Sequence, residues 1–165
     1  MARDVKKIDN KGRFYIPARI KEEFSGDLVV TNSFDRGYLC VYKREDYEKL
    51  EKDFLGNANY FSRDARIFQK LIIAPKIDVT LDSQSRLTIT DELWENIGAL
   101  RGDDICVFDV GSRLEICTVE TYKNEDWDYG AIERLSEKYT ASSPSSFGNV
   151  TVDNSNSDVT NPTAN

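Results

Sequence analysis

The stretch IDNKGRFYI, residues 8–16, returns 73 residues later as LDSQSRLTI, residues 81–89. Both copies keep an aspartate and, four positions further on, an arginine, whereas most of the residues between them differ. Apolar positions continue to fall on apolar positions over about 45 residues, once three extra residues are allowed in the second copy. The chain therefore contains an internal repeat that is present twice.

Each copy predicts the same elements: two short strands joined by a turn, a short helix and a hairpin. Phe14 and Ile16 alternate with polar positions, as in a half-buried strand. Pro17 is acceptable in a first helical turn, and Gly26 fits the end of a helix. Apolar runs separated by turn residues predict the hairpin strands, at 28–31 and 38–42 in the first copy and at 105–108 and 114–117 in the second.

Helical spacing of apolar residues and a capping Ser62 predict two helices between the copies, the second ending near Ile73. After Tyr139 the composition becomes polar, without Lys or Arg, which is typical of disorder. We therefore expect a first repeat over 3–50, linking helices over 51–75, a second repeat over 76–122, a C-terminal helix over 123–139 and a disordered polar tail over 140–165. The fold class is α+β, mainly β with helices. Because four short strands alone leave exposed edges, we expect the two copies to close one small pseudo-two-fold barrel.

The composition weakens most catalytic hypotheses. The 165 residues include no histidine, so imidazole ligands and Ser-His or Cys-His nucleophile pairs are excluded. We expect no catalytic residue, metal, cofactor or small-molecule substrate. Cys40, Cys106 and Cys117 stand in apolar strand-like runs and are expected to be buried thiols. No apolar run approaches the length of a membrane span, so we expect no membrane partner and a cytoplasmic protein.

The DxxxR pattern has a structural and a functional interpretation. In the structural one, Asp9 caps backbone amides of a turn and Gly12 takes its left-handed position. In the functional one, Asp9 also pairs with Arg13 and fixes the guanidinium fork, and Asp82 does the same for Arg86. We expect such a fork at an exposed loop tip, where it would serve recognition.

Charge is distributed unevenly around the two turns. The chain has a formal charge of −7, yet residues 3–21 hold seven cations and only two carboxylates. At the equivalent second-copy positions only the first cation and the DxxxR arginine remain. A solvated basic face would account for Lys6 and Lys7, but clustering beside an oriented arginine favours nucleic acid. We therefore expect Arg13 and Lys11 to contact bases or phosphates and Lys6 and Lys7 to contact phosphates.

The segment IDNKGRFYIPARIKEEF, the hairpin and helix GYLCVYKREDYEKLE, the helix RDARIFQKLIIAP, then LDSQSRLTI and RLEI together resemble the MraZ family over residues 3–138. The resemblance implies two tandem AbrB-type swapped-hairpin halves, each with a DxxxR motif. It also implies a transcriptional regulator of the division and cell-wall gene cluster that includes its own gene. Further implications are association with the nucleoid and a ring-like homo-oligomer that binds G-rich direct repeats in double-stranded promoter DNA. We expect it to be a repressor in which Arg86 also contacts DNA.

Two residues depart from the family pattern. Ser85 replaces the turn glycine, and Thr90 replaces the usual proline. If the second turn keeps a left-handed residue, Ser85 costs about 1 kcal/mol, so we expect this turn to relax and to aim Arg86 less well.

Two other functions compete with DNA binding. AbrB-type antitoxins act through a disordered tail that binds a partner, but the tail here offers only Phe147, Val150 and Val152 as apolar anchors. An enzyme would have to rely on carboxylates such as Asp9 and Asp82, without histidine or a phosphate-binding loop.

Overall fold

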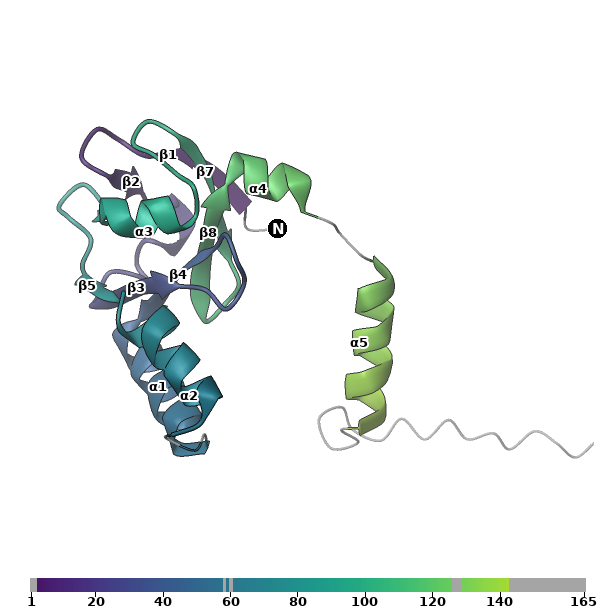
Figure 1. Ribbon diagram of the computed structural model, residues 1–165. Coiled ribbons are helices and arrows are strands. Elements are labelled where there is room, and N and C mark those ends of the chain that lie inside the picture. The colour runs from purple at the N-terminus through teal and green to yellow at the C-terminus, as the bar shows by residue number, and fades with distance from the viewer. Residues whose placement is uncertain (1–2, 58, 60, 126–128, 143–165) are drawn as a thin grey trace, which may run out of the picture. The chain divides into compact units, whose positions relative to one another are not determined.

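The computed structural model describes residues 3–57, 59, 61–125 and 129–142 (Figure 1). The chain divides into two compact units, residues 1–125 and residues 126–165. The described part of the second unit is the helix α5 (Tyr129–Ser142). No helix in the described ranges combines the length and the apolar character that crossing a membrane requires.

The first unit alternates strands with short helices in an order that repeats. The first half contains β1 (Arg3–Lys7), β2 (Arg13–Tyr15), the 3-10 helix η1 (Ala18–Ile20), β3 (Leu28–Asn32) and β4 (Leu39–Lys43). The connection contains α1 (Arg44–Asn57), α2 (Arg63–Phe68) and the π-helix η2 (Gln69–Ile73). The second half contains β5 (Ile77–Val79), β6 (Arg86–Thr88), α3 (Asp91–Asn96), β7 (Asp104–Asp109) and β8 (Arg113–Thr118), followed by α4 (Val119–Asn124).

The two halves exchange their first strands. In the six-stranded sheet the order is β1-β7-β8-β4-β3-β5, and all neighbours are antiparallel. The first strand of the first half thus pairs with the hairpin of the second half, and the first strand of the second half pairs with the hairpin of the first. The second strands, β2 and β6, pair with each other in a separate two-stranded ribbon. The sheet is therefore pseudo-symmetric: reversing the strand order and exchanging β1 with β5, β3 with β7 and β4 with β8 gives the same order again.

The expected closed barrel is wrong, because the six-stranded sheet is open, with β1 and β5 at its edges. A closed barrel would leave no unpaired strand edges, which otherwise invite pairing with other chains. Here the edges are short and charged: β1 reads RDVKK, and Asp78 of β5 forms a 3.0 Å ion pair with Arg44. Short, charged edge strands resist pairing, so the sheet is protected without closing.

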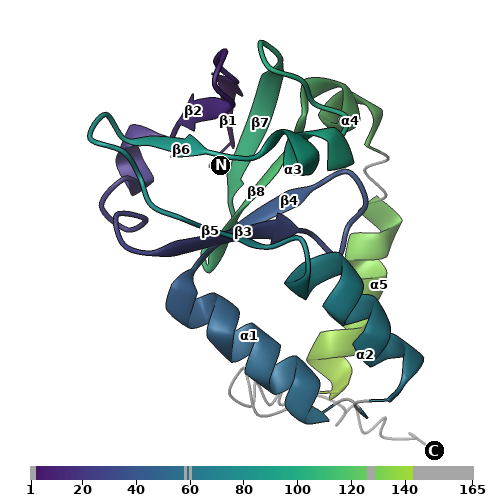
Figure 2. The ribbon, with the colours of Figure 1, turned by 60° about the vertical axis from the view of Figure 1, so that its left-hand side comes forward.

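The main core lies between one face of the sheet, the ribbon and the short helices η1 and α3 (Figure 2). Phe14 of β2 and Leu87 of β6 are 1% and 0% exposed and belong to this cluster. Trp94 of α3 packs edge-to-face on Phe14, with ring centroids 5.9 Å apart. The ribbon is thus anchored from below by apolar side chains of both halves.

Helices α1, α2 and η2 cover the other face of β3 and β4, where a second cluster contains Tyr42, Tyr47 and Phe68. The predicted cap and end of the second linking helix are confirmed: Ser62 caps α2 by accepting a 3.1 Å hydrogen bond from the Ala65 amide, and the helical segment ends at Ile73. The first linking helix, α1, begins at Arg44, before the expected bound at residue 51. Thr31 Oγ1 donates to the Ile72 carbonyl at 2.6 Å and so ties η2 to the sheet.

The predicted hairpins are also confirmed, as β3–β4 and β7–β8. Cys40, Cys106 and Cys117 are buried thiols, as expected. At the C-terminal end, α4 stops at Asn124 and α5 continues to Ser142, beyond the helix expected over 123–139. The tail expected to be disordered lies, from residue 143 onwards, outside the described residues.

Candidate nucleic-acid interface

One aspartate organises the first DxxxR turn. Asp9 Oδ1 accepts hydrogen bonds from the backbone amides of Lys11 and Arg13, each at 2.9 Å, and Asp9 Oδ2 accepts one from Arg13 Nε at 2.7 Å. Gly12 has a φ of +79°, and a Cβ at this position would lie 2.9 Å from the Ile89 carbonyl oxygen. Conformation and space both require glycine here.

The second turn repeats this geometry. Asp82 Oδ1 accepts from the amides of Gln84 and Arg86 at 2.9 Å, and Asp82 Oδ2 accepts from Arg86 Nε at 2.7 Å. Ser85 keeps the left-handed conformation, with a φ of 62°. The expected relaxation of this turn is therefore wrong: the hydrogen bonds of Asp82 hold Arg86 in place despite the strain at Ser85.

The structure gives a reason for Thr90, which stands where the family usually has proline. Its hydroxyl accepts a hydrogen bond from the Leu93 amide at 3.4 Å, at the N-cap of α3. The equivalent Pro17 precedes η1 without a side-chain cap. A threonine at this position therefore satisfies an amide at the start of the longer helix.

Both arginines lie on one face of the ribbon formed by β2 and β6. The three pairs across it are Arg13 with Thr88, Phe14 with Leu87, and Tyr15 with Arg86. Because side chains alternate along a strand, burial of Phe14 and Leu87 places the other four on the opposite, solvent-facing side. The two fixed guanidinium groups thus share a single surface.

The expectation that Arg13 stands at an exposed loop tip is wrong. Its side chain is 21% exposed and that of Arg86 is 19% exposed. The reason is that each arginine begins a strand, and its guanidinium folds back onto the aspartate of its own turn. At the solvent-facing tip of the first turn stands Lys11 instead.

The pKa values of the two aspartates reflect these contacts. Partial burial raises the pKa of Asp9, but hydrogen bonds from the Arg13 and Lys11 amides and from the Arg13 guanidinium outweigh it and lower the pKa to about 2. Hydrogen bonding from the Arg86 amide lowers the pKa of Asp82 against the opposing effect of burial. Both carboxylates are therefore ionised at neutral pH and keep their arginines oriented.

The structure does not bring Lys6 and Lys7 together. They lie on opposite faces of β1, with Lys6 half-buried and Lys7 exposed. Lys7 Nζ lies 3.0 Å from Asp104 Oδ1 and donates to the Gly102 carbonyl at 3.1 Å. A phosphate contact by Lys7 would therefore have to compete with Asp104.

Three side chains in or beside the ribbon were not predicted from the sequence. Tyr15 is half exposed, and its ring centroid lies 5.9 Å from Arg86 Cζ. Trp94 Nε1 donates to the Gly12 carbonyl at 3.0 Å, and Arg101 Nη1 donates to the Asn10 carbonyl at 2.8 Å. The hydrogen-bond partners are 82 and 91 residues apart in the chain, so no local pattern indicates them.

Comparison with known proteins identifies the family. The family profile described as "MraZ protein, putative antitoxin-like" matches residues 3–71. The transcriptional regulator MraZ of Heliobacterium modesticaldum is 32% identical over 133 residues, which are 79% of this chain and 90% of that relative. This chain belongs to the MraZ family.

Two further MraZ proteins show similarity over most of this chain. The transcriptional regulator MraZ of Cytophaga hutchinsonii is 33% identical over 139 residues, covering 81% of this chain and 89% of the relative. That of Alkaliphilus oremlandii is 30% identical over 142 residues, covering 86% of this chain and 93% of the relative. The similarity to the MraZ family is thus not confined to the first half.

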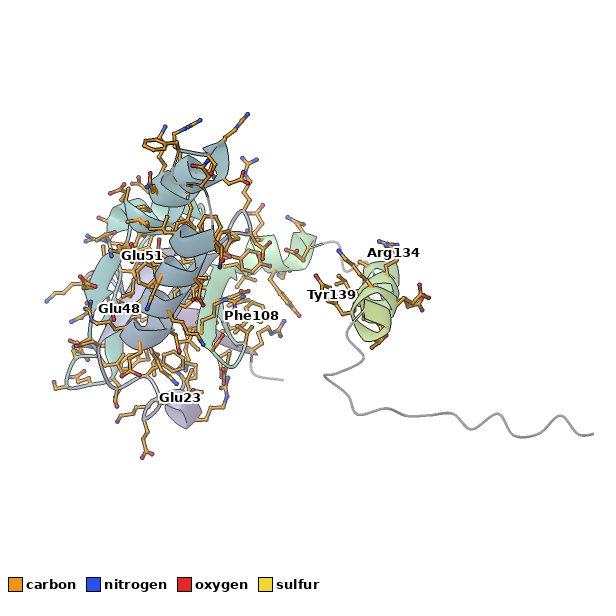
Figure 3. The ribbon with its side chains drawn as sticks, turned by 90° about the horizontal axis from the view of Figure 1, so that it is seen from below. Glu23, Glu48, Glu51, Phe108, Arg134 and Tyr139 are labelled. Carbon is orange, nitrogen blue, oxygen red and sulfur yellow. The ribbon has the colours of Figure 1, made fainter. Side chains whose placement is uncertain are left out.

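Helix α1 of this MraZ-family chain carries a net negative charge. Helix α1 lies at the end of the first unit opposite β2 (Figures 1 and 2), and its carboxylates Glu48 and Glu51 are visible from below (Figure 3). The helix carries five carboxylates, Glu45, Asp46, Glu48, Glu51 and Asp53, against three cations, Arg44, Lys49 and Lys52. Part of the net negative charge of the chain is therefore located at the end of the first unit that lies away from the ribbon.

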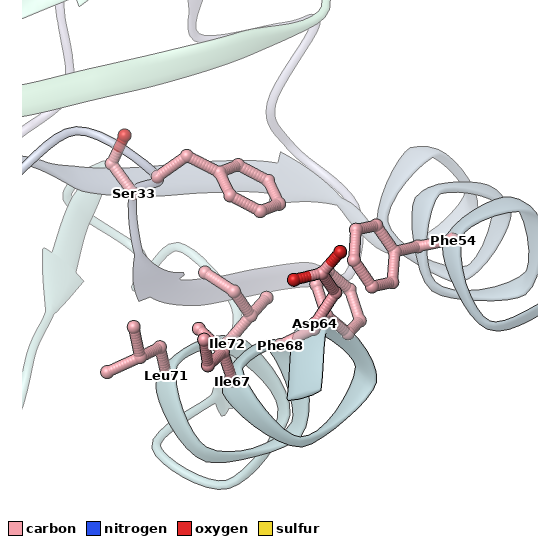
Figure 4. A pocket seen from close by; sticks show the side chains of 8 residues that line it. Ser33, Phe54, Asp64, Ile67, Phe68, Leu71 and Ile72 are labelled. Carbon is pink, nitrogen blue, oxygen red and sulfur yellow. The ribbon is translucent and has the colours of Figure 1, made fainter. Parts of the chain in front are cut away.

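A cavity of about 290 Å³ lies at the same end as α1 (Figure 4). It is lined mainly by apolar side chains, with Asp64 as the charged one: Ser33, Phe34, Phe54, Asp64, Ile67, Phe68, Leu71 and Ile72. Within the described ranges, no group of three or more Asp, Glu or Cys side chains is placed to hold a metal ion. The ribbon and its two turns are the candidate site that the geometry favours.

Proposed function

We propose that this protein is a sequence-specific DNA-binding transcriptional regulator, acting as a repressor, whose reading surface is the β2–β6 ribbon with its two DxxxR turns. One observation carries the proposal: Arg13 and Arg86 are each fixed by an aspartate and lie on the same side of one ribbon, each with about a fifth of its side chain exposed. The relatives' name, transcriptional regulator MraZ, supports it. Two-stranded ribbons are narrow enough to enter the major groove.

The proposed base contact uses the free edge of each arginine fork. Arg13 Nε donates to Asp9, which leaves the Nη groups on the other edge of the guanidinium for a base. A pair of guanidinium donors matches the O6 and N7 acceptors of guanine, the commonest specific contact in the major groove. This chemistry supports the proposed binding to G-rich direct repeats.

Lysines would supply the sequence-independent part of binding. Lys11 stands exposed at the first turn, while Lys6 and Lys7 of β1 would reach phosphates from their separate positions. The expected targets are promoter repeats upstream of the division and cell-wall gene cluster that includes its own gene, in the nucleoid of the cytoplasm.

Footprinting on the protein's own upstream region tests this function. Protection of G-rich direct repeats by the full chain, lost in Arg13→Ala, is the expected result. Equal protection of the region and of unrelated DNA would contradict sequence-specific regulation.

We further propose that the protein binds as a ring-like homo-oligomer. One protomer presents a single pair of turns, and linking several pairs multiplies weak contacts by avidity. Sedimentation of the protein alone and on DNA with one or several repeats tests this. A monomer that binds a single repeat as tightly as an array would contradict the ring.

A second function is favoured by the "antitoxin-like" wording of the family description and by the exposed stripe Ile132, Leu135 and Tyr139 on α5. In it the C-terminal unit would bind a protein partner. The variant Leu135→Glu separates the two functions: it should leave operator binding unchanged if the ribbon acts on DNA, and it should abolish partner binding if the second function holds.

A further inference from the structure

We infer that Trp94 and Arg101, which belong to the second half of the chain, are positioning residues for DNA reading by the first DxxxR turn. This inference rests on the proposed function, since it concerns how one of the two turns is held toward DNA. The observations are two hydrogen bonds that cross from one half to the other and end on adjacent parts of the same turn.

Trp94 holds the carbonyl that precedes Arg13. Its side chain is 1% exposed, and Nε1 donates to the Gly12 carbonyl at 3.0 Å, which also accepts from the Ile89 amide at 3.1 Å. The indole is fixed in turn by its edge-to-face contact with Phe14. A carbonyl held by two buried donors cannot rotate without leaving one of them unsatisfied. The peptide that leads into Arg13 is therefore fixed.

Arg101 holds the other side of the turn. Its Nη1 donates to the Asn10 carbonyl at 2.8 Å, while Nε and Nη2 form a bidentate pair with Asp91 at 2.9 and 2.8 Å. A bidentate pair fixes the plane of a guanidinium. Asp91 therefore orients Arg101, and Arg101 in turn orients the peptide next to Lys11.

The second turn lacks these side chains by sequence. The residue equivalent to Trp94 is Lys21, which has no ring, and the residue equivalent to Arg101 is Ser25, whose hydroxyl donates to the Glu22 carbonyl at 2.7 Å. What the turns share is the backbone bond between the halves, Ile89 N to Gly12 O and Ile16 N to Ser85 O, each at 3.1 Å. The first turn is thus the more firmly held of the two, and it is the one that discriminates bases.

The experiment compares affinity for a duplex with the upstream direct repeats against affinity for a scrambled duplex of equal length. In Trp94→Phe, an aromatic ring remains but the hydrogen-bond donor is lost. Operator affinity should then fall about tenfold, because a loosened turn loses part of the free energy of one bidentate base contact. Affinity for the scrambled duplex should stay the same. The matched control Tyr47→Phe removes a buried hydroxyl far from the turns, in the α1 cluster, and should change neither affinity.

Asp91→Asn gives a second readout, because the loss of charge and the loss of positioning predict opposite changes in operator affinity. Removing a carboxylate near DNA strengthens binding by simple electrostatics. Loosening Arg101 should instead weaken operator binding without weakening scrambled binding, and Arg101→Ala combined with Asp91→Asn should lose no more than Arg101→Ala alone. Ser25→Ala, at the position equivalent to Arg101, should have no effect.

Two results would overturn the inference: a parallel loss of operator and scrambled affinity in Trp94→Phe, or tighter operator binding in Asp91→Asn. A lower slope of log affinity against log salt in Arg101→Ala would also overturn it, because it would make Arg101 a direct phosphate contact. Arg13→Ala keeps this outcome separate from failure of the proposed function. If Arg13→Ala weakens operator binding while Trp94→Phe leaves it intact, only the positioning role fails. If Arg13→Ala binds normally, the ribbon itself is not the reading surface.

Discussion

Arg13 and Arg86 lie diagonally across the β2–β6 ribbon, Arg13 opposite Thr88 and Arg86 opposite Tyr15. Diagonal neighbours in an antiparallel pair are about 7–8 Å apart, a distance that long side chains can span. Neighbouring base pairs along a duplex are separated by about 3.4 Å, so two such forks can address bases within one short stretch of groove. The ribbon therefore offers one compact pair of contacts instead of two distant ones.

Replacing each arginine by alanine separates their roles. Arg13→Ala should weaken operator binding by about 10- to 100-fold, as expected for loss of a bidentate guanine contact, and should lower the melting temperature modestly, because Asp9 loses its ion-pair partner. Arg86→Ala should weaken it less, because its turn has Gln84 where the first has Lys11. Operator titrations and thermal unfolding of both variants test this. Equal losses of affinity with equal changes in melting temperature would show that the two turns contact DNA equally.

Asp9→Asn should loosen Arg13 while leaving the turn in place. An asparagine can still accept hydrogen bonds from the Lys11 and Arg13 amides through Oδ1, but its amide group would face Arg13 Nε, donor against donor. Operator affinity should fall, whereas Asp82→Asn should have the smaller effect. Operator titrations of the two variants measure this difference, and unchanged binding by Asp9→Asn would contradict the orienting role.

The same carboxylate predicts how stability depends on pH. The folded pKa of Asp9 is about 2, below its ordinary value of 3.8. A lowered pKa means that ionised Asp9 stabilises the folded state fully above about pH 4 and progressively less as pH falls toward 2. Denaturant unfolding of the wild type and of Asp9→Asn should give free energies that converge over this interval. A difference that is constant from pH 5 to about pH 2 would contradict the assignment.

The left-handed residues of the two turns give a matched pair of variants. Gly12→Ala should destabilise the protein by more than about 1 kcal/mol, since the φ of +79° is unfavourable for alanine and the new Cβ would approach Ile89 O to 2.9 Å. Ser85→Gly should instead stabilise it by up to about 1 kcal/mol, because glycine adopts a φ of 62° readily. Chemical unfolding measures both changes. A destabilised Ser85→Gly would show that the serine is not strained.

Salt dependence tests the lysines as phosphate contacts. The logarithm of operator affinity should fall linearly with the logarithm of salt concentration, by about 0.9 per phosphate neutralised. Lys11→Gln should reduce this slope by about one contact, whereas Lys49→Gln on α1 serves as the control and should leave it unchanged. A flat response of the wild type to salt would exclude phosphate contacts by these lysines.

Local patterns predicted the elements of this fold but not how they associate. The hairpins, the Ser62 cap and the Asp9–Arg13 pair all depend on residues near one another in the chain, where period and turn chemistry are informative. The open sheet was not predicted, because a pattern of short strands does not show whether their edges are shielded by charge. The hydrogen bonds of Trp94 and Arg101 were not predicted for a related reason. Their acceptors are backbone carbonyls in the other half, and a carbonyl has no sequence signature.

The exchange of first strands also constrains how the chain is made. Arg3 of β1 pairs with Phe108 of β7, so the N-terminal strand has no partner until most of the first unit has been synthesised. At about 5–20 residues per second, β1 would wait roughly 5–20 seconds on the ribosome before pairing. Because β1 is short and charged, it resists pairing with other chains while it remains unpaired. The sheet can therefore be completed only late in translation, and a nascent chain released before β7 would carry a first half that cannot complete its own sheet.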